Sequence, residues 1–240
     1  MNLSIITINY NNKNGLDKTL KSIQAQGFKD YESIVIDGGS SDGSVEVLKQ
    51  YESIITYWHS EKDAGIYDAM NKGILKAKGD YILFLNSGDY LYEENSLFEF
   101  FKYKFSEAVV YGNMIIRKAS GEMLEGFSPS SVTFQHLHLD TIWHPVSLYR
   151  RDLFSRFGLY NLEFRIVADY EFLLRIYFSK SVSWRYIPVF LSVFTLDGVS
   201  SLPDNLEKLK LERKRAQLKN YPISFLIKIY WNILKERLSR

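Results

Sequence analysis

The chain has 240 residues, of which 46% are hydrophobic and 15% aromatic, enough apolar material for one large or two small folded domains. It contains no cysteine, which excludes disulfide frameworks, thiolate metal sites and cysteine nucleophiles. The formal net charge of +2 divides unevenly. From Asn205 onward there are ten basic and three acidic residues, which leaves twenty basic and twenty-five acidic residues in positions 1–204. An acidic body and a basic C-terminal segment indicate two different kinds of binding partner.

Two kinds of targeting segment are not expected. The first residues lack a basic stretch followed by a long apolar run, so the pattern predicts no secretion signal there. No stretch approaches the ~18 charge-free apolar residues of a membrane-spanning helix. We therefore do not expect an integral membrane protein.

The first ninety residues alternate strand and helix patterns. Short β-branched or apolar runs predict strands, and apolar residues at helical spacing predict helices between them. The expected strands are Leu3–Tyr10, Ser33–Asp37, Ile54–His59 and Tyr81–Leu85. Three helices are expected between them. The first is capped by Asn11 or Asn12, the second is capped by Ser41 or Asp42, and the third covers Ile66–Ala77. Because Tyr81–Leu85 is apolar on both faces, we expect a central parallel strand in an open, mostly parallel, Rossmann-like α/β sheet, with the site at the carboxyl ends of the strands.

The pattern changes after Asn95. A helix is expected over Asn95–Phe105, and the strand Ala108–Arg117 is expected to turn through Gly121 into a hairpin. Residues 127–150 are expected to be irregular. A helix resumes at Asp169, a strand-like segment covers 182–194, and residues 205–240 are helical with a break at Pro222.

Three carboxylates fall where this topology places chemistry. Asp37 ends the second strand, Asp89 follows the fourth, and Asp169 opens a helix in the second half. An ionised Asp is costly to bury unpaired, so a carboxylate just past a buried strand favours a binding or catalytic role. Each residue taken alone could equally be a turn or helix-capping residue, which Asp favours. Their occurrence together favours a site.

Glycines accompany two of these carboxylates. Gly38, Gly39 and Gly43 flank the first and Gly88 precedes Asp89, so the backbone there can adopt unusual conformations and a ligand can approach closely. The spacing matches neither the dinucleotide-binding fingerprint nor a P-loop. Oxygen ligands of this kind, together with phosphates and water, suit Mg²⁺ or Mn²⁺.

Six motifs in a fixed order resemble those of a known family. They are IDGGSSDGS, EKDAGIYDAMNKGI, FLNSGD, HPVSLYRRDLF, ADYEFLLR and LDGVSS. Together they resemble the family 2 glycosyltransferases of the GT-A fold, in particular bacterial enzymes that assemble exopolysaccharide, capsule or O-antigen repeat units. The resemblance covers roughly residues 1–200 and implies a GT-A fold with a C-terminal helical extension.

The resemblance also implies a role for each matching residue. Asp37 matches the acid that reads the nucleotide base and ribose, Asp89 falls in the motif that binds metal and diphosphate, and Asp169 matches the catalytic base. His144 and Glu171 match positions on the acceptor side. The other positions implied to bind the nucleotide sugar are Gly38, Asp63, Gly65, Asp68, Asn71 and Asn86.

The sequence departs from the family's usual metal motif. That motif is Asp-x-Asp, whereas the aligned positions here read Asn86, Ser87, Gly88 and Asp89, so the two leading acids are missing. Asn86 still offers a carbonyl oxygen. A divalent cation, Mg²⁺ or Mn²⁺, is expected because the charge of a departing nucleoside diphosphate must be neutralised, a task that Lys or Arg can share.

The implied reaction is inverting transfer from a UDP- or GDP-sugar to a glycan acceptor, often linked to a polyprenyl carrier, in surface polysaccharide synthesis. Asp169 would remove the acceptor proton while the nucleoside diphosphate leaves from the opposite face. Two rival functions remain: a catalytically degenerate glycosyltransferase-like binding scaffold, and a sugar nucleotidyltransferase. The second is disfavoured because NYNNKNG, after the first strand, has one lysine and no glycine cluster.

Histidines and aromatic residues give further candidates. His136 and His138 would share one face of a strand and could bind metal, although no third ligand is evident. His144 is either a substrate contact or an ordinary loop residue. Trp143 and Tyr67 could stack on a sugar or base, or simply belong to the core.

The C-terminal segment combines basic and apolar residues. Apolar residues recur at helical spacing over 223–238, and basic residues lie before and within this stretch. The pattern is typical of a helix on an anionic membrane surface. Alternatively, the helix packs on its own domain or on a second copy in a homodimer. Nucleic-acid binding is disfavoured because the body is acidic.

We expect a catalytic domain over 1–204, a basic amphipathic tail over 205–240, and a cytoplasmic location at the inner face of the cell membrane.

Overall fold

The first four strands form a parallel unit, as their pattern predicts. In the computed structural model, which describes residues 2–196, 205–225 and 227, they are β1 (Leu3–Asn9), β2 (Tyr31–Asp37), β3 (Tyr57–Ser60) and β4 (Tyr81–Phe84). Their order in the sheet is β3-β2-β1-β4, with parallel pairing throughout. The chain therefore moves outward to one side of β1 and returns to the other side with β4. Such a switch point leaves a crevice at the carboxyl ends of the two strands.

Three helices connect these strands: α1 (Lys13–Gln24), α2 (Ser44–Gln50) and α3 (Ile66–Lys76). Asn12, one of the two residues expected to cap α1, is its N-cap, and its side chain accepts a hydrogen bond from the Gly15 N–H. The expected cap of α2, Ser41 or Asp42, is wrong. Gly43 is the N-cap residue of α2, with φ 93°, and Asp42 instead accepts hydrogen bonds from the N–H and hydroxyl of Ser44.

The second half extends the same sheet with mixed pairing. The added strands are β5 (Tyr90–Leu91), β6 (Val109–Arg117), β7 (Met123–Gly126), β8 (Ser147–Arg150) and β9 (Trp184–Thr195). The sheet order continues from β4 through β8, β6, β9 and β5, and β7 forms the expected hairpin with β6. Because β8 pairs antiparallel with β4, that buried strand has one parallel and one antiparallel neighbour, rather than lying inside a purely parallel sheet.

The expectation of irregular structure over 127–150 was wrong. This segment contains α5 (Phe134–Leu139), a short 3-10 turn (His144–Val146) and β8. The remaining helices are α4 (Ser96–Phe101), α6 (Asp152–Phe157), α7 (Ala168–Tyr177) and α8 (Leu206–Asn220).

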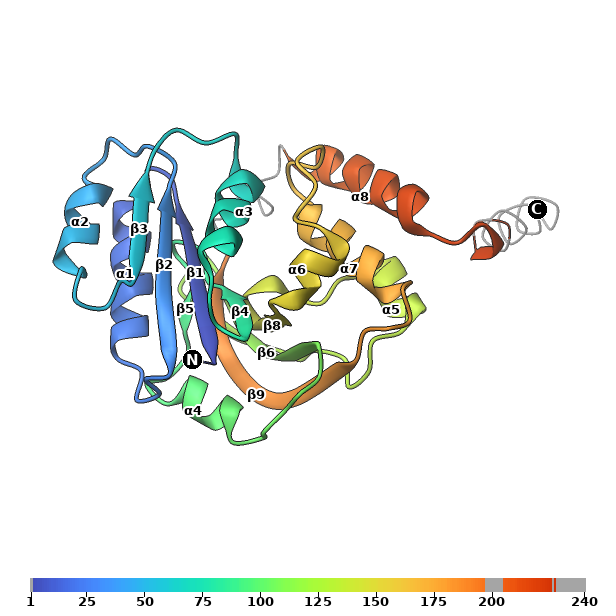
Figure 1. The fold of residues 1–240 in the computed structure, drawn as a ribbon, viewed down its shortest axis with the longest axis horizontal. Coiled ribbons are helices and arrows are strands. Elements are labelled where there is room, and N and C mark those ends of the chain that lie inside the picture. The colour runs from blue at the N-terminus through green and yellow to red at the C-terminus, as the bar shows by residue number, and fades with distance from the viewer. Residues whose placement is uncertain (1, 197–204, 226, 228–240) are drawn as a thin grey trace.

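Two apolar cores lie on opposite faces of the sheet. Along β1, Leu3 and Ile5 pack with α1, α2 and α4, whereas Ile6 and Ile8 pack with α3, α6 and α7. The alternation follows from the two-residue period of a strand covered on both faces. Figure 1 shows the helices on either side of the sheet and the long, curved β9.

Helix α8 packs against α7 and ends before the predicted break at Pro222. Tyr221, just after it, is buried, and its hydroxyl hydrogen-bonds His138. No helix within 2–196, 205–225 and 227 is long and apolar enough to cross a membrane. Most of the predicted membrane-binding stretch 223–238 lies outside the described residues, and the division into a catalytic domain and a tail stays a prediction.

Candidate active site

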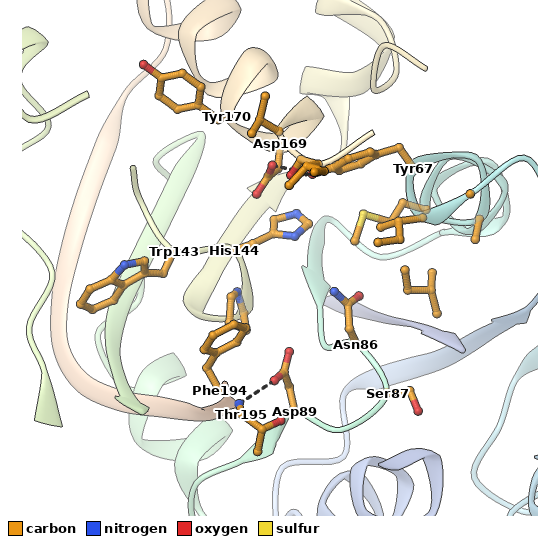
Figure 2. A pocket seen from close by; sticks show the side chains of 18 of the residues that line it. Tyr67, Asn86, Ser87, Asp89, Trp143, His144, Asp169, Tyr170, Phe194 and Thr195 are labelled. Carbon is orange, nitrogen blue, oxygen red and sulfur yellow. Dashed lines mark hydrogen bonds between the residues drawn. The ribbon is translucent and has the colours of Figure 1, made fainter. Parts of the chain in front are cut away.

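A cavity of about 800 Å³ opens at the switch point between β1 and β4. Its walls come from the ends of both strands, the start of α3, the 3-10 turn, the start of α7 and α8. A volume of this size suits a ligand larger than a simple metabolite. The predicted site residues on its walls are Asp63, Gly65, Asn86, Asp89, His144 and Asp169. Figure 2 shows Asp169 and Asp89 on different sides of this cavity, with His144 between them in the view.

The loop after β4 is held by α1 and by the end of β9. The Thr19 hydroxyl donates to the Asp89 carbonyl at 2.6 Å and accepts from the Gly88 N–H at 3.0 Å. The Asp89 carboxylate accepts from the Thr195 N–H at 3.2 Å (Figure 2). Gly88 has φ 108°, a backbone conformation that favours glycine. These contacts fix the Asp89 side chain at the cavity wall.

Asn86 presents an unsatisfied acceptor in the same loop. Its Oδ1 atom is buried and has no hydrogen-bond partner among the described residues. Leaving a buried polar atom unpaired costs about 1–3 kcal/mol, so such an atom beside a cavity indicates a place for a ligand.

Asp169 lies in the first turn of α7, as its position at the start of a helix predicts. Its Oδ1 is 2.7 Å from the Tyr67 hydroxyl, which is also 2.8 Å from the Ile166 carbonyl. Burial, and next the negative charge of Asp169, raise the pKa of Tyr67 well above its usual value. Tyr67 therefore remains a protonated donor. It is 6% exposed, so its ring belongs to the core and offers little surface for stacking on a sugar.

His144 is a neutral group beside the acid. Its Nε2 is 2.9 Å from the Tyr160 hydroxyl, and its ring stacks on Phe84 with the ring centres 4.6 Å apart. Burial lowers the pKa of His144, and the charge of Asp169 only partly opposes this effect. The imidazole can therefore contact a sugar hydroxyl without carrying a positive charge.

Asp37 lies behind the cavity wall and is fully buried. Its two oxygens accept hydrogen bonds from the side chains of Asn9, Ser40 and Ser60 and from the N–H groups of Gly39 and Ser40. Burial alone would raise the pKa of Asp37, but these hydrogen bonds together outweigh it, and the pKa is lowered. In this structure Asp37 organises the loop after β2. Direct contact with a nucleotide stays a prediction.

Glycines shape the wall that this loop shares with α3. A Cβ atom at Gly38 would lie 2.7 Å from Asp63 Oδ2, so only glycine lets the loop pass there without displacing Asp63. Asp63 Oδ1 accepts from the Gly65 N–H at 2.9 Å. Gly65, with φ 116°, is the N-cap residue of α3.

Two further predicted site residues, Asp68 and Asn71, lie on α3 outside the cavity lining and stabilise the segments around it. Asp68 accepts from the Ala64 N–H at 3.0 Å and forms an ion pair with Lys72. The Asn71 amide both donates to the Tyr160 carbonyl and accepts from the Tyr160 N–H, each at 2.9 Å. Asn71 thereby fixes the segment that carries the His144 partner.

Glu171 is buried beside the cavity lining and is not part of it. It is 2% exposed, and its carboxylate pairs with Arg175 at 2.9 Å and accepts from Asn220 at 3.2 Å. It joins α7 to the end of α8, and its predicted role on the acceptor side remains untested.

His136 and His138 do not share a strand face, because they lie in α5. His136 Nε2 hydrogen-bonds the Thr141 carbonyl, and His138 Nδ1 hydrogen-bonds the Tyr221 hydroxyl. Among the described residues, no group of three or more His, Asp or Glu side chains is arranged to hold a metal ion.

Comparison with known proteins settles the family. Residues 4–158 match the profile of glycosyl transferase family 2. The chain belongs to glycosyl transferase family 2. An uncharacterized glycosyltransferase of Mycobacterium tuberculosis is 37% identical over 177 residues, covering 72% of this chain and 68% of the relative. A PGL/p-HBAD biosynthesis glycosyltransferase of Mycobacterium bovis is 32% identical over 204 residues, covering 81% and 77%.

Solved structures confirm the expected fold. S. aureus TarS in complex with UDP superposes with a TM-score of 0.66 at 20% identity, over 81% of this chain and 60% of the TarS chain. The mannosyltransferase PcManGT from Pyrobaculum calidifontis, in complex with GDP-Man and Mn²⁺, gives a TM-score of 0.62 at 14% identity, over 83% and 58%. This family 2 glycosyltransferase thus spans about 60% of the length of the TarS chain.

Several residues of this family 2 glycosyltransferase line the cavity but were not predicted to be site residues. Tyr10, 67% exposed, and Asn12 follow β1, and Leu209 and Arg213 come from α8. The run of asparagines after the first strand was a usable signal for the first two, because that strand borders the switch point. No local signal identifies the α8 residues, because a contact between the C-terminal segment and the site depends on the folded chain.

Proposed function

We propose that this protein transfers a sugar from a nucleotide-sugar donor to an acceptor hydroxyl, with inversion, in the assembly of a cell-surface glycan. The observation that carries the proposal is the single cavity that joins Asn86 and Asp89 on one side to Asp169 on another. The names of the relatives, and the UDP and GDP-Man bound by the structural neighbours, support the same class of donor and product.

The donor would occupy the side formed by β1, β4 and the start of α3. The exposed ring of Tyr10 offers a face on which a nucleotide base can stack. Asn12 and Asp63 provide hydrogen-bonding groups on the same wall. The glycines near Asp63 and Asp89 let a diphosphate approach the backbone closely.

A divalent cation fits the loop after β4. The unpaired Asn86 Oδ1 and the Asp89 carboxylate are hard oxygen donors, and Mg²⁺ or Mn²⁺ commonly takes only one or two protein ligands when phosphates supply the others. Such a cation would neutralise the charge of the leaving diphosphate. Asn86 and Asp89 are the residues that would hold it.

Asp169 is the proposed base. The acceptor hydroxyl gives its proton to the Asp169 carboxylate as its oxygen bonds to the anomeric carbon. The bond from that carbon to the diphosphate oxygen breaks on the opposite face, and the nucleoside diphosphate departs. Tyr67 keeps the carboxylate oriented, and neutral His144 lies where it can contact a sugar hydroxyl.

The other side of the cavity suits an acceptor with an apolar portion. Its lining is rich in hydrophobic side chains, namely Met114, Ile116, Trp143, Phe194, Leu196 and Leu209. A glycan on a lipid carrier has that combination of polar and apolar parts. The basic C-terminal segment would then hold the enzyme at the inner face of the cell membrane.

Replacing the proposed base tests the function. In the Asp169→Asn variant, release of UDP or GDP from a panel of nucleotide sugars, with a polyprenyl-linked sugar as acceptor, should fall by ~10²–10⁴-fold, the usual contribution of a general base. Donor binding, measured as a thermal shift with Mn²⁺ present, should persist because Asp169 lies off the donor wall. Asp80→Asn, which changes an exposed carboxylate before β4, is the control. Near-normal turnover of Asp169→Asn would remove the base assignment.

A further inference from the structure

Helix α8 supplies a carboxylate to the segment just before α7. Glu212 accepts hydrogen bonds from three consecutive backbone N–H groups, those of Arg165 at 2.9 Å, Ile166 at 2.8 Å and Val167 at 3.3 Å. Val167 is the N-cap residue of α7, and no side chain of the local sequence caps this helix. The Val167 N–H is one of the N–H groups that have no partner within the helix, and Glu212 binds it from a position 45 residues later in the chain.

This segment leads directly into the base. Asp169 is in the first turn of α7, two residues after Val167. A carboxylate at a helix N-terminus is favourable because it compensates the unpaired N–H groups and the helix dipole. Losing Glu212 would leave the three N–H groups without their side-chain partner just before the residue that carries the proposed base.

Ile166 is held from two sides. Its N–H donates to Glu212 on α8, and its carbonyl is 2.8 Å from the Tyr67 hydroxyl on α3. That same hydroxyl is 2.7 Å from Asp169. The position of Asp169 is thus defined by contacts to α3 on the cavity side and to α8 behind it.

Helix α8 is itself anchored on this region. Arg213 donates to carbonyl groups at the end of α5, and its guanidinium lies 3.9 Å from the centre of the Tyr170 ring. Gln217 donates to the Tyr170 hydroxyl at 2.9 Å. Because Tyr170 directly follows Asp169, these contacts fix α8 against the same helical turn.

We propose that Glu212 is a positioning residue for the catalytic base, so that α8 is part of the catalytic unit and not only a connection to the tail. The inference rests on the proposed function in one respect, the role of Asp169. It adds that the C-terminal segment controls where that base lies.

The test measures the environment of Asp169 and turnover in the full chain. The Asp169 carboxyl carbon is observed by ¹³C NMR at neutral pH, with Asp169→Asn used to assign its signal. In Glu212→Gln its chemical shift should differ from that of the wild type, because the segment that leads into α7 loses its carboxylate partner. Turnover should fall by about 3–10-fold in Glu212→Gln and by about 10–100-fold in Glu212→Ala, since misplacing a catalytic group by a fraction of an ångström to 1 Å has effects of this order. Donor KM should change by less than about twofold, because the donor wall lies elsewhere.

Glu207→Gln is the matched control, because Glu207 is an exposed residue of the same helix that pairs only with Lys210 among the described residues. An unchanged Asp169 chemical shift in Glu212→Gln, or the same change in Glu207→Gln, would overturn the proposal. Loss of donor binding in parallel with turnover would also overturn it, by showing a general structural role. The NMR signal does not depend on activity. If the wild-type protein transfers no sugar, the proposed function fails while the role of Glu212 is still decided.

Discussion

The hydroxyl of Tyr67 lies between two acceptors and has one proton to share between them. When it donates to Asp169, it stabilises the ionised carboxylate and orients it toward the cavity. Because burial and the charge of Asp169 raise the pKa of Tyr67, this proton is retained throughout the physiological range. The residue therefore acts on the base without taking part in proton transfer.

Tyr67→Phe should lower turnover by about 10–100-fold, because a hydrogen bond to a charged group contributes about 1.5–3 kcal/mol. Turnover is measured as release of UDP or GDP from the donor.

Tyr51→Phe offers a closely matched control. The Tyr51 hydroxyl also donates to an aspartate, Asp17 on α1, at 3.0 Å, but this pair lies outside the cavity lining. Its removal should leave turnover unchanged. If both variants lower turnover alike, or if Tyr67→Phe leaves it unchanged, the orienting role of Tyr67 is wrong.

At the scale of elements, the loop after β2 depends on one buried carboxylate. Asp37 ties this loop to β1 through Asn9 and to β3 through Ser60. Its hydrogen bonds overcome the cost of burial and hold its pKa below the usual value. A group whose pKa is lowered on folding stabilises the native state above the pKa of the unfolded chain, ~3.9 for Asp. That contribution is lost as the pH falls through the lower value of the folded protein.

Asp37→Asn should therefore reduce the free energy of unfolding at neutral pH by about 1–3 kcal/mol, since an amide cannot accept all of these hydrogen bonds. Urea unfolding of both proteins between pH 7 and pH 3 should show the difference shrinking below about pH 4. The other carboxylates are common to both proteins and cancel in the comparison. A difference that stays constant with pH would mean that the ionised form of Asp37 does not stabilise this loop.

The elements that were predicted correctly have local causes. The strands and helices of the first ninety residues follow from apolar spacing, and Asn12 caps α1 within its own sequence neighbourhood. Of the missed elements, β8 depends on distant partners. It has only four residues, Ser147–Arg150, and exists because β4 and β6 flank it. The short α5 begins at Phe134 and has a local cap, because the Thr133 side chain accepts from the His136 N–H. Its six residues are too few to give a clear apolar spacing.

The predicted site shows the same division. The topology rule places chemistry at the ends of β1 and β4, and Asn86 and Asp89 lie there. The rule does not distinguish a carboxylate that faces the cavity from one that faces the loop behind it. It therefore predicts a nucleotide contact for Asp37 and misses the five hydrogen bonds that Asp37 accepts within the protein. The partnership of Tyr67 with Asp169 spans 102 positions along the chain, and only the folded structure reveals it.

At the scale of the whole molecule, the uneven charge has a structural counterpart in α8. The inner side of this helix binds the segment just before α7 through Glu212 and lines part of the cavity through Leu209 and Arg213. Its outer side exposes Leu211 and Leu218 together with basic residues, namely Lys208, Lys210, Lys214, Arg215 and Lys219. If an anionic membrane binds this side and the sequence beyond it, the site and the membrane contact share one helix.

A truncation after Phe225 tests the membrane contact while leaving α8 in place. It keeps Tyr221 bonded to His138 and Phe225 packed on Phe134, but removes four basic residues and one acidic residue, Lys228, Lys235, Arg237, Arg240 and Glu236. Each basic residue near an anionic surface contributes about 1 kcal/mol, so the truncated protein should bind phosphatidylglycerol vesicles at least about tenfold more weakly in a sedimentation assay.

Binding of the full chain should fall at high salt and be weak on neutral phosphatidylcholine vesicles, because the attraction is electrostatic. Nucleotide-sugar binding, measured by thermal shift, should be equal in both proteins, which separates membrane contact from folding. Equal sedimentation of the two proteins would show that the sequence beyond Phe225 does not bind the membrane.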